Sequence, residues 1–431
     1  MLGRSSPLLA TQQPDTARRR VLHCTVAAAA WLTLASATAA APVPAPGAIT
    51  GASTGNGCTG AMDWPLWQSF AERHIQSDGR VVDHSTQRLH STSEGQSYAM
   101  LFALVAQDRT RFEQLWRWSV ANLSGGDASV QLPAWQWGRR DDGSWGVIDA
   151  NTASDANLWF VYALAEAGRL WQAPQYSRDA LALLPLITAE EVVNLPGLGA
   201  MLLPGRSGFA TTAQQWRLNP SYLPLPVLRR LEQLQPTGPW NAIARNTAHM
   251  LGKTTPQGLA PDWVLYRAAA PVGDAPATSG AFMVDSETGD LGSYEAIRVY
   301  LWAGMPARGD PLATPLLKTL GGMARVLAAT GLPPEKVRTL SASTSGTAPA
   351  GFSAALLPYL RATGQTALLN AQRARAQAGL KTSLPQPWPT YYDYVLGLFG
   401  TGWDEQRYQF LPSGRLKLRS EKACSPNAQK S

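Results

Sequence analysis

The sequence has little charge and few histidines, and each shortage excludes a class of protein. Charged residues make up only 16% of the 431 residues, and the formal net charge is +7. Nearly half of that charge lies in residues 1–39, and no run of Lys or Arg follows, so a nucleic-acid partner is not expected. The five histidines show no HExxH or other paired metal-ligand spacing, and no P-loop or nucleophile-elbow motif stands in its proper context. We therefore expect neither a metal nor a cofactor.

The first sixty residues predict export. A run of arginines at positions 18–20 precedes an apolar stretch over residues 21–35, and Ala37 and Ala39 form a small-x-small site after it. This is the layout of a signal peptide over residues 1–39, of either the general or the twin-arginine type. A membrane anchor is the weaker alternative, because the stretch is short and rich in alanine. The mature protein is then periplasmic or secreted, with no stable membrane insertion.

Cysteine is also scarce, and its placement is informative. Of the three cysteines, Cys24 leaves with the signal peptide, while Cys58 and Cys424 remain near the two ends of the mature chain. A lone pair in an oxidising compartment predicts a disulfide between them. Residues 40–60, uncharged and rich in Pro, Ala and Gly, predict a flexible lead-in before the folded part.

The body of the chain predicts one large, all-α domain over residues 61–410, followed by a C-terminal tail over 411–431. Apolar residues recur at helical spacing over 98–105, 158–165, 297–302, 354–360 and 394–399, and several of these stretches are apolar on more than one side. That pattern favours two layers of helices, inner and outer. Long loops rich in Gly, Pro and Trp are expected over 132–148, 195–226 and 271–293, and loops of that length are usually functional.

Three of the predicted helices begin with an acid. Glu94, Asp155 and Glu295 each lie at the start of an apolar helical stretch, beside Ser and an aromatic residue. Each alone is explained by helix capping, since acids favour helix N-termini and Ser93 with Gln96 forms a capping box. If the inner helices run parallel, however, their N-termini meet at one rim and the acids face a common cleft.

Paired carboxylates across an aromatic groove are what glycoside hydrolysis requires, one acting as general acid and the other activating water or attacking the sugar. Trp135, Trp137 and Trp145 lie in one of the long loops and offer flat rings on which sugars stack, with ordinary core packing as the alternative. The chain has 16 Trp against 9 Phe, an excess that also favours aromatic ligand surfaces.

At these residues the chain resembles glycoside hydrolase family 8, and in particular its periplasmic endo-β-1,4-glucanases found beside bacterial cellulose synthases. The resembling stretches follow one another in order along nearly the whole mature chain: TSEGQSYAM (92–100), LPAWQWG (132–138), NTASDANLW (151–159), EEVVNLPGLGAMLLPG (190–205), WRLNPSYLP (216–224), SYEAIRVYLWAGM (293–305), PAGFSAALLPYL (349–360) and YYDYVLGLFGTGWD (391–404).

The resemblance implies an (α/α)6 barrel with a groove for a β-1,4-glucan chain, hydrolysed with inversion, and the cellulose synthase export machinery as a possible partner. Glu94 matches the family's general acid, Glu295 stands where the family usually has an Asp as base, and Asp155 matches the acid that contacts the sugar at the cleavage point. The resemblance also assigns substrate contacts to Trp135, Tyr222, Tyr294, Arg298 and Tyr392, and the stacking argument adds Trp137.

Two departures from the family pattern leave alternatives open. Asn157 replaces the second Asp of the family's A-[ST]-D-[AG]-D signature. Glu295 is one methylene longer than Asp, and inversion needs room for a water between the carboxyl groups. The base could therefore be Glu295, Asp155 or an acid of residues 285–290. A glucan-binding module with weak catalysis, and a relative acting on chitosan, xylan or mixed-linkage glucan, are the rival functions.

Overall fold

The computed structural model describes residues 63–270, 277–381 and 389–419. The predicted signal peptide (1–39), the lead-in (40–60) and the predicted Cys58–Cys424 disulfide lie outside the described residues. No helix in the described ranges is long and apolar enough to cross a membrane.

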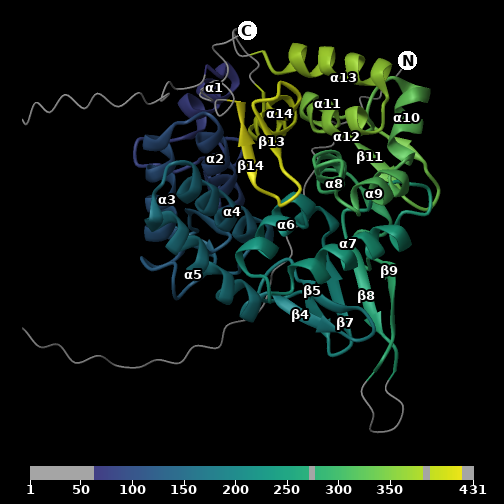
Figure 1. Cartoon of the computed structure of the whole chain (residues 1–431), viewed down its shortest axis with the longest axis horizontal. Coiled ribbons are helices and arrows are strands. Elements are labelled where there is room, and N and C mark those ends of the chain that lie inside the picture. The colour runs from purple at the N-terminus through teal and green to yellow at the C-terminus, as the bar shows by residue number, and fades with distance from the viewer. Residues whose placement is uncertain (1–62, 271–276, 382–388, 420–431) are drawn as a thin grey trace, which may run out of the picture. The chain divides into compact units, whose positions relative to one another are not determined.

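The helices of the described chain are arranged in two layers (Figure 1). The inner helices are α2 (Ser93–Val105), α4 (Ser154–Leu170), α6 (Leu225–Leu234), α8 (Ala296–Gly304), α11 (Ala350–Ala355) with its continuation α12 (Leu357–Ala362), and α14 (Tyr391–Asp404). The outer helices are α1 (Pro65–His74), α3 (Arg109–Leu123), α5 (Pro174–Glu190), α7 (Trp240–Thr254), α9 (Ala313–Thr319), α10 (Gly322–Thr330) and α13 (Thr366–Gly379). The predicted helical class and double layer are confirmed.

The apolar pattern explains which helices lie inside. Every residue of α2 except Glu94 is buried, and all of α8 is buried, because these helices are apolar around their whole circumference. Outer helix α3 instead buries residues such as Phe112, Leu115 and Trp116 on one face only. Glycine lets the inner helices approach closely: a Cβ on Gly400 of α14 would lie 1.9 Å from the backbone oxygen of Ala354 on α11.

The inner helices form a closed ring around an aromatic core. Each contacts the next along the chain, from α2 through α4, α6, α8 and α12 to α14. Phe399 of α14 joins the two ends of the ring, since its ring centroid lies 4.7 Å from that of Phe102 on α2. It also lies 5.3 Å from Trp159 on α4 and 5.0 Å from Trp302 on α8. Outer helix α1 packs on α14, so the first and last described helices are neighbours.

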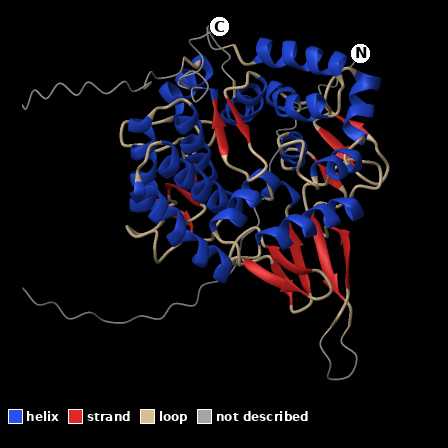
Figure 2. Ribbon diagram, in the orientation of Figure 1, coloured by secondary structure: helices blue, strands red, loops and turns tan. Residues whose placement is uncertain are grey.

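The long connections contain more strand than predicted (Figure 2). The stretch 132–148 folds largely into the hairpin of β2 (Gln136–Arg139) and β3 (Trp145–Asp149), and β1 (Ser91–Thr92) pairs with β2. A second hairpin joins β4 (Val192–Leu195) to β5 (Gly199–Leu202). An antiparallel sheet consists of β6 (Ala210–Thr212), β7 (Gln215–Leu218), β8 (Val264–Ala268) and β9 (Gly280–Val284), in that order. A smaller sheet combines β10 (Leu291–Gly292), β11 (Lys336–Arg338) and β12 (Thr344–Ser345). The stretches 132–148, 195–226 and 271–293 are therefore not simply loops.

A C-terminal hairpin belongs to the domain and corrects the predicted boundary at residue 410. Strands β13 (Tyr408–Phe410) and β14 (Leu416–Leu418) pair with each other, and Leu416 and Leu418 are buried. The fully buried Glu166, near the C-terminal end of α4, accepts hydrogen bonds from the backbone N–H of Leu416 and from Arg169 and Arg230. The described part of the predicted tail, residues 411–419, is thus part of the folded core.

Candidate active site

Glu94 lies in the first turn of α2, as predicted, but the cap differs. Thr92, not Ser93, is the N-cap residue, and its hydroxyl accepts a hydrogen bond of 3.2 Å from the N–H of Gly95. Gln96 does not complete a capping box. Its buried amide instead accepts from the N–H of Val81 and donates to three acceptors on the preceding loop and α3. The polar residues therefore predict the start of the helix correctly, while the role of Gln96 is to hold α2 against α3 and the preceding loop.

The carboxyl group of Glu94 is held in surroundings that favour its protonated form. Its Oε1 accepts a hydrogen bond of 3.1 Å from the Trp135 indole, and the Ser93 hydroxyl lies 3.3 Å from Oε2. The side chain remains partly accessible to solvent, although protein surrounds it on most sides. That burial, followed by the negative charge of Asp155, raises the pKa of Glu94 to about 8. Glu94 therefore carries a proton at neutral pH and can donate it.

Asp155 lies in the first turn of α4 and is fully engaged with protein groups. Its Oδ1 accepts from the N–H of Ala156, and its Oδ2 accepts from the Tyr98 hydroxyl at 2.7 Å and from Arg298 at 3.3 Å. The residue is 1% exposed. Burial raises the pKa of Asp155, while Arg298 and Tyr98 oppose that rise by stabilising the carboxylate. Asp155 thus acts as a buried charge that positions its neighbours.

Glu295 occupies the N-cap position of α8, one residue before the helix, rather than its first turn. Its Oε2 accepts hydrogen bonds of 3.1 Å from Asn219 and from the Ser221 hydroxyl, and it pairs with Arg298. Its Oε1 receives no hydrogen bond from the residues that the structure describes, and the side chain is 32% exposed. One carboxylate oxygen is fixed and the other is free to bind a water molecule.

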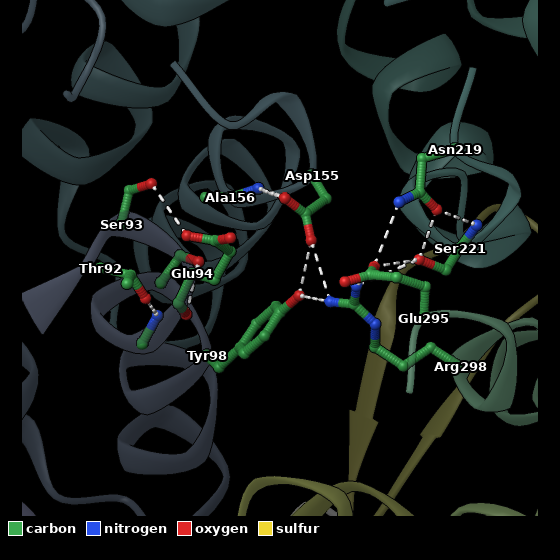
Figure 3. A network of polar contacts seen from close by, with 12 residues as sticks. Thr92, Ser93, Glu94, Tyr98, Asp155, Ala156, Asn219, Ser221, Glu295 and Arg298 are labelled. Atoms are coloured by element: carbon green, nitrogen blue, oxygen red, sulfur yellow. Dashed lines mark hydrogen bonds and ion pairs between the residues drawn. The ribbon is translucent and has the colours of Figure 1, made fainter. Parts of the chain in front are cut away.

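Arg298 links two of the three acids, Asp155 and Glu295 (Figure 3). One guanidinium nitrogen donates to Tyr98 and Asp155, and the other donates to Ser221 and Glu295. The close-up shows Glu94 and Glu295 on either side of the Asp155–Arg298 pair. The predicted convergence of the acids at one end of the inner ring is therefore observed.

The backbone before α8 is fixed as well. The carboxylate of Asp262 accepts from the N–H groups of Ser293 and Ala296, at 2.7 and 2.8 Å, and so caps the start of the helix that carries Glu295. Sequence reasoning missed this residue, because Asp262 lies far from Glu295 in the chain and follows no helix signature.

The structure separates the candidates for the second catalytic carboxylate. Both oxygens of Asp155 are occupied and the residue is closed to solvent, which leaves no oxygen for a reacting water. Asp285 is buried, and both of its oxygens bind Arg217. Asp290 accepts from the N–H of Leu340. Glu287, the remaining acid of residues 285–290, is 65% exposed and pairs with Arg217 rather than with Arg298. Of the two acids bound to Arg298, Glu295 alone has a free, accessible oxygen. Within the described ranges, no group of three or more His, Cys, Asp or Glu side chains is arranged to hold a metal ion.

Three tryptophans on or beside the β1–β2–β3 sheet differ in their exposure. Trp135, 36% exposed, contacts Glu94 directly. Trp137 stacks on Trp145, with ring centroids 5.5 Å apart and an interplanar angle of 20°, and the Arg80 guanidinium lies 4.4 Å from the Trp137 ring. Trp137 is partly buried, and its ring supports the ring of Trp145, which is 46% exposed.

Predicted aromatic residues surround the other acids. The Tyr222 ring lies 5.5 Å from the Arg298 guanidinium and 6.4 Å from the Trp263 ring. Tyr294 is 43% exposed, and its backbone carbonyl accepts a hydrogen bond of 2.6 Å from the Tyr392 hydroxyl. The structure therefore places Arg298 within the polar network and the Tyr222 ring beside its guanidinium. Tyr294 precedes Glu295 in the chain, and the hydrogen bond from Tyr392 brings that residue to the same place. Trp263, which sequence reasoning did not single out, continues the aromatic surface from Tyr222.

Comparison with known proteins identifies the chain. Residues 52–406 match the profile of the glycosyl hydrolases family 8. The chain belongs to this family. An endoglucanase of Pseudomonas fluorescens (strain SBW25) is 49% identical over 375 residues, which cover 84% of this chain and 93% of that protein. An endoglucanase of Xanthomonas axonopodis pv. citri (strain 306) is 47% identical over 402 residues, or 93% of this chain and 96% of that one.

A solved structure agrees with this family 8 assignment. The endo-1,4-D-glucanase of Vibrio fischeri ES114 is 38% identical and superposes with a TM-score of 0.73, covering 83% of this chain and 99% of that chain. The double layer of helices is accordingly the (α/α)6 barrel of family 8, and the chain is a glycoside hydrolase. The acids at one end of its inner ring form the candidate active site.

Proposed function

We propose that this family 8 enzyme hydrolyses β-1,4-glucan at internal linkages with inversion of configuration, with Glu94 as general acid and Glu295 as general base. The observation that carries the proposal is the difference between the two carboxyl groups. Glu94 is held protonated at neutral pH, whereas Glu295 has one anchored oxygen and one free oxygen. Such unequal surroundings are how a carboxyl pair divides acid and base roles.

The reaction balances with these groups alone. Glu94 transfers its proton to the glycosidic oxygen as the bond from that oxygen to the anomeric carbon breaks, and the bonding electrons remain on the leaving oxygen. A water molecule bound at Oε1 of Glu295 attacks the anomeric carbon from the opposite face and gives a proton to Glu295. Glu94 ends ionised and Glu295 protonated, and exchange with solvent restores both.

The cellular setting is part of the proposal. The basic, apolar and small-residue pattern of residues 1–39 supports export to the periplasm or beyond. The resemblance of the chain to glucanases found beside cellulose synthases supports trimming of nascent glucan during cellulose synthesis and export. The synthase machinery is accordingly the proposed partner, and cellulose the proposed substrate.

The test is a substrate panel read for stereochemistry. The mature protein is incubated with carboxymethylcellulose, chitosan, xylan and mixed-linkage glucan, and new reducing ends are counted. Cello-oligosaccharide cleavage is followed by proton NMR from the first seconds. We expect the fastest release from carboxymethylcellulose and an α-anomer as the first product. A first product in the β form contradicts inversion, and faster release from another polysaccharide reassigns the substrate.

Trp145 offers a binding prediction. Its exposed ring is held flat by Trp137 and Arg80, so it can stack on a sugar without first being ordered. Removing one stacked aromatic ring costs about 1 kcal/mol, so Trp145→Ala should raise KM for long cello-oligosaccharides about fivefold with kcat nearly unchanged. Trp403→Ala, at the C-terminal end of α14, is the matched control and should leave KM unchanged. Equal KM values in Trp145→Ala and wild type would remove Trp145 from the groove.

A further inference from the structure

A buried carboxyl group behind the active site has no part in the proposed reaction. Glu191 follows the last residue of α5 and is 0% exposed. Its Oε1 accepts hydrogen bonds from the Thr152 hydroxyl and, at 2.9 Å, from the side-chain amide of Asn157. Asn157 lies in the first two turns of α4, two residues beyond Asp155. Glu191 therefore ties the end of α5 to the start of the helix that carries Asp155.

If Glu191 were ionised, two atoms of its contact with Asn157 would have no hydrogen-bond partner. Glu191 Oε2 and Asn157 Oδ1 are both buried and neither has a hydrogen-bond partner. Both atoms accept hydrogen bonds, so an ionised Glu191 would leave two buried acceptors unsatisfied at the two ends of one contact, which destabilises the folded state. A proton on Oε2 removes both defects together, because a carboxylic acid and a primary amide can exchange two hydrogen bonds in one ring.

The charges around Glu191 favour the same state. Asp155 on α4 and Glu190 on α5 contribute negative charge around it, and Arg206 pairs with Glu190 at 3.7 Å. Arg206 gives the cluster only its backbone N–H, which donates to Thr152. Burial, with smaller contributions from Glu190 and Asp155, raises the pKa of Glu191 to about 8.

We propose that Glu191 is a positioning residue, held as a neutral acid in a closed acid–amide pair with Asn157, that fixes the first turn of α4 without adding a negative charge behind Asp155. Asn157 thereby accounts for a departure from the family signature. An Asp at this position would make an acid–carboxylate pair with one shared proton and one negative charge. The amide keeps both hydrogen bonds and removes that charge.

The direct test is the pH dependence of stability in Glu191→Gln, which has the shape of the neutral acid. Below about pH 4.5, Glu191 is protonated in both folded and unfolded wild type, so the stabilities of wild type and Glu191→Gln change with pH in the same way. From there to about pH 8 the unfolded wild type loses the proton and the folded protein keeps it, so wild type loses stability as pH rises. Glutamine never ionises. We expect the Tm of Glu191→Gln to gain roughly 5 °C on wild type between pH 5 and pH 8.

Glu190→Gln is the matched control, because Glu190 adjoins Glu191 and is 31% exposed. Its Tm gap to wild type should widen far less with pH, because burial contributes more than the charge of Glu190 to the high pKa of Glu191. Infrared spectra at pH 7 should show the carbonyl band of a protonated carboxyl group in wild type and in Glu190→Gln, reduced in Glu191→Gln. A constant Tm gap, or an unchanged band, overturns the neutral acid. Neither reading depends on the proposed glucanase activity.

The positioning role is tested separately by measurements of activity, and this test rests on the proposed function. Glu191→Gln should keep kcat within about twofold at pH 7, whereas Glu191→Leu, which leaves Thr152 and Asn157 without their acceptor, should lose at least tenfold. Asn157→Asp restores a negative charge behind Asp155, so the alkaline limb of its kcat/KM profile should move to higher pH. A large loss in Glu191→Gln, or an unmoved limb in Asn157→Asp, overturns the positioning role.

Discussion

Replacing Glu94 with Gln is expected to lower kcat on cello-oligosaccharides by about three orders of magnitude. The amide has no proton to give to the glycosidic oxygen, and a positioned general acid contributes about 10²- to 10⁴-fold. Gln keeps the size of Glu94 and can still accept the Trp135 hydrogen bond, so oligosaccharide affinity measured by calorimetry should stay within about twofold. Glu113→Gln, at an exposed site on α3, is the control for the same substitution.

The pH profile adds an independent check on this assignment. Because Glu94 must be protonated to act, kcat/KM of the wild type should fall as pH rises through about 8. The charge of Asp155 contributes to that high pKa, so Asp155→Asn should move the alkaline limb to lower pH. Turnover retained in Glu94→Gln, or an alkaline limb that Asp155→Asn leaves in place, would assign the proton donor elsewhere.

Replacing Glu295 with Gln should lower kcat by about two to four orders of magnitude, because the amide cannot take a proton from the attacking water. The anchored side would survive, since a Gln oxygen can still accept from Asn219, Ser221 and Arg298. Single-turnover kinetics on a reducing-end-labelled oligosaccharide separates this chemical step from binding. The control is Glu287→Gln, which changes a 65% exposed Glu paired with Arg217.

Glu295→Asp decides whether the longer side chain is a defect. Oε2 is fixed at the present length by Asn219, Ser221 and Arg298, so a side chain shorter by one methylene must give up those contacts or withdraw its free oxygen from the water. We expect about a tenfold loss of kcat. A large gain would instead mean that Glu295 impairs the site, and would favour a glucan-binding role with weak catalysis.

The three acids were predictable because each stands at the start of a strongly apolar stretch, where helix N-termini are easiest to locate. The network of hydrogen bonds around these acids was harder to predict. Tyr98 fits the apolar stripe of α2, yet its hydroxyl bonds to Asp155. Asn219 and Ser221 lie in a short turn with no helical or strand period, and their contacts to Glu295 span more than 70 positions of the chain. Such contacts depend on the closed ring rather than on local sequence.

The strands escaped prediction for a different reason. A strand shows itself in a sequence when one face is buried and the other exposed, so that apolar and polar residues alternate. Strand β6 is exposed along its whole length, and β9 is exposed at every position except Phe282. With no buried face there is no period of two to detect. Inner helices such as α2 and α8, buried on nearly every side over nine or more residues, gave a far stronger pattern.

The closure of the inner ring constrains how the chain reaches its final state during synthesis. Ser69 on α1 bonds to Tyr394 on α14 across 325 positions, and Leu416 completes the buried charge cluster of Glu166 across 250. A ribosome delivers these partners at opposite ends of translation. Until the last segment emerges, the incomplete ring exposes apolar surface and leaves Glu166 without the donor from Leu416. A transcript that ends before the codons for β13 and β14 therefore encodes an incomplete domain.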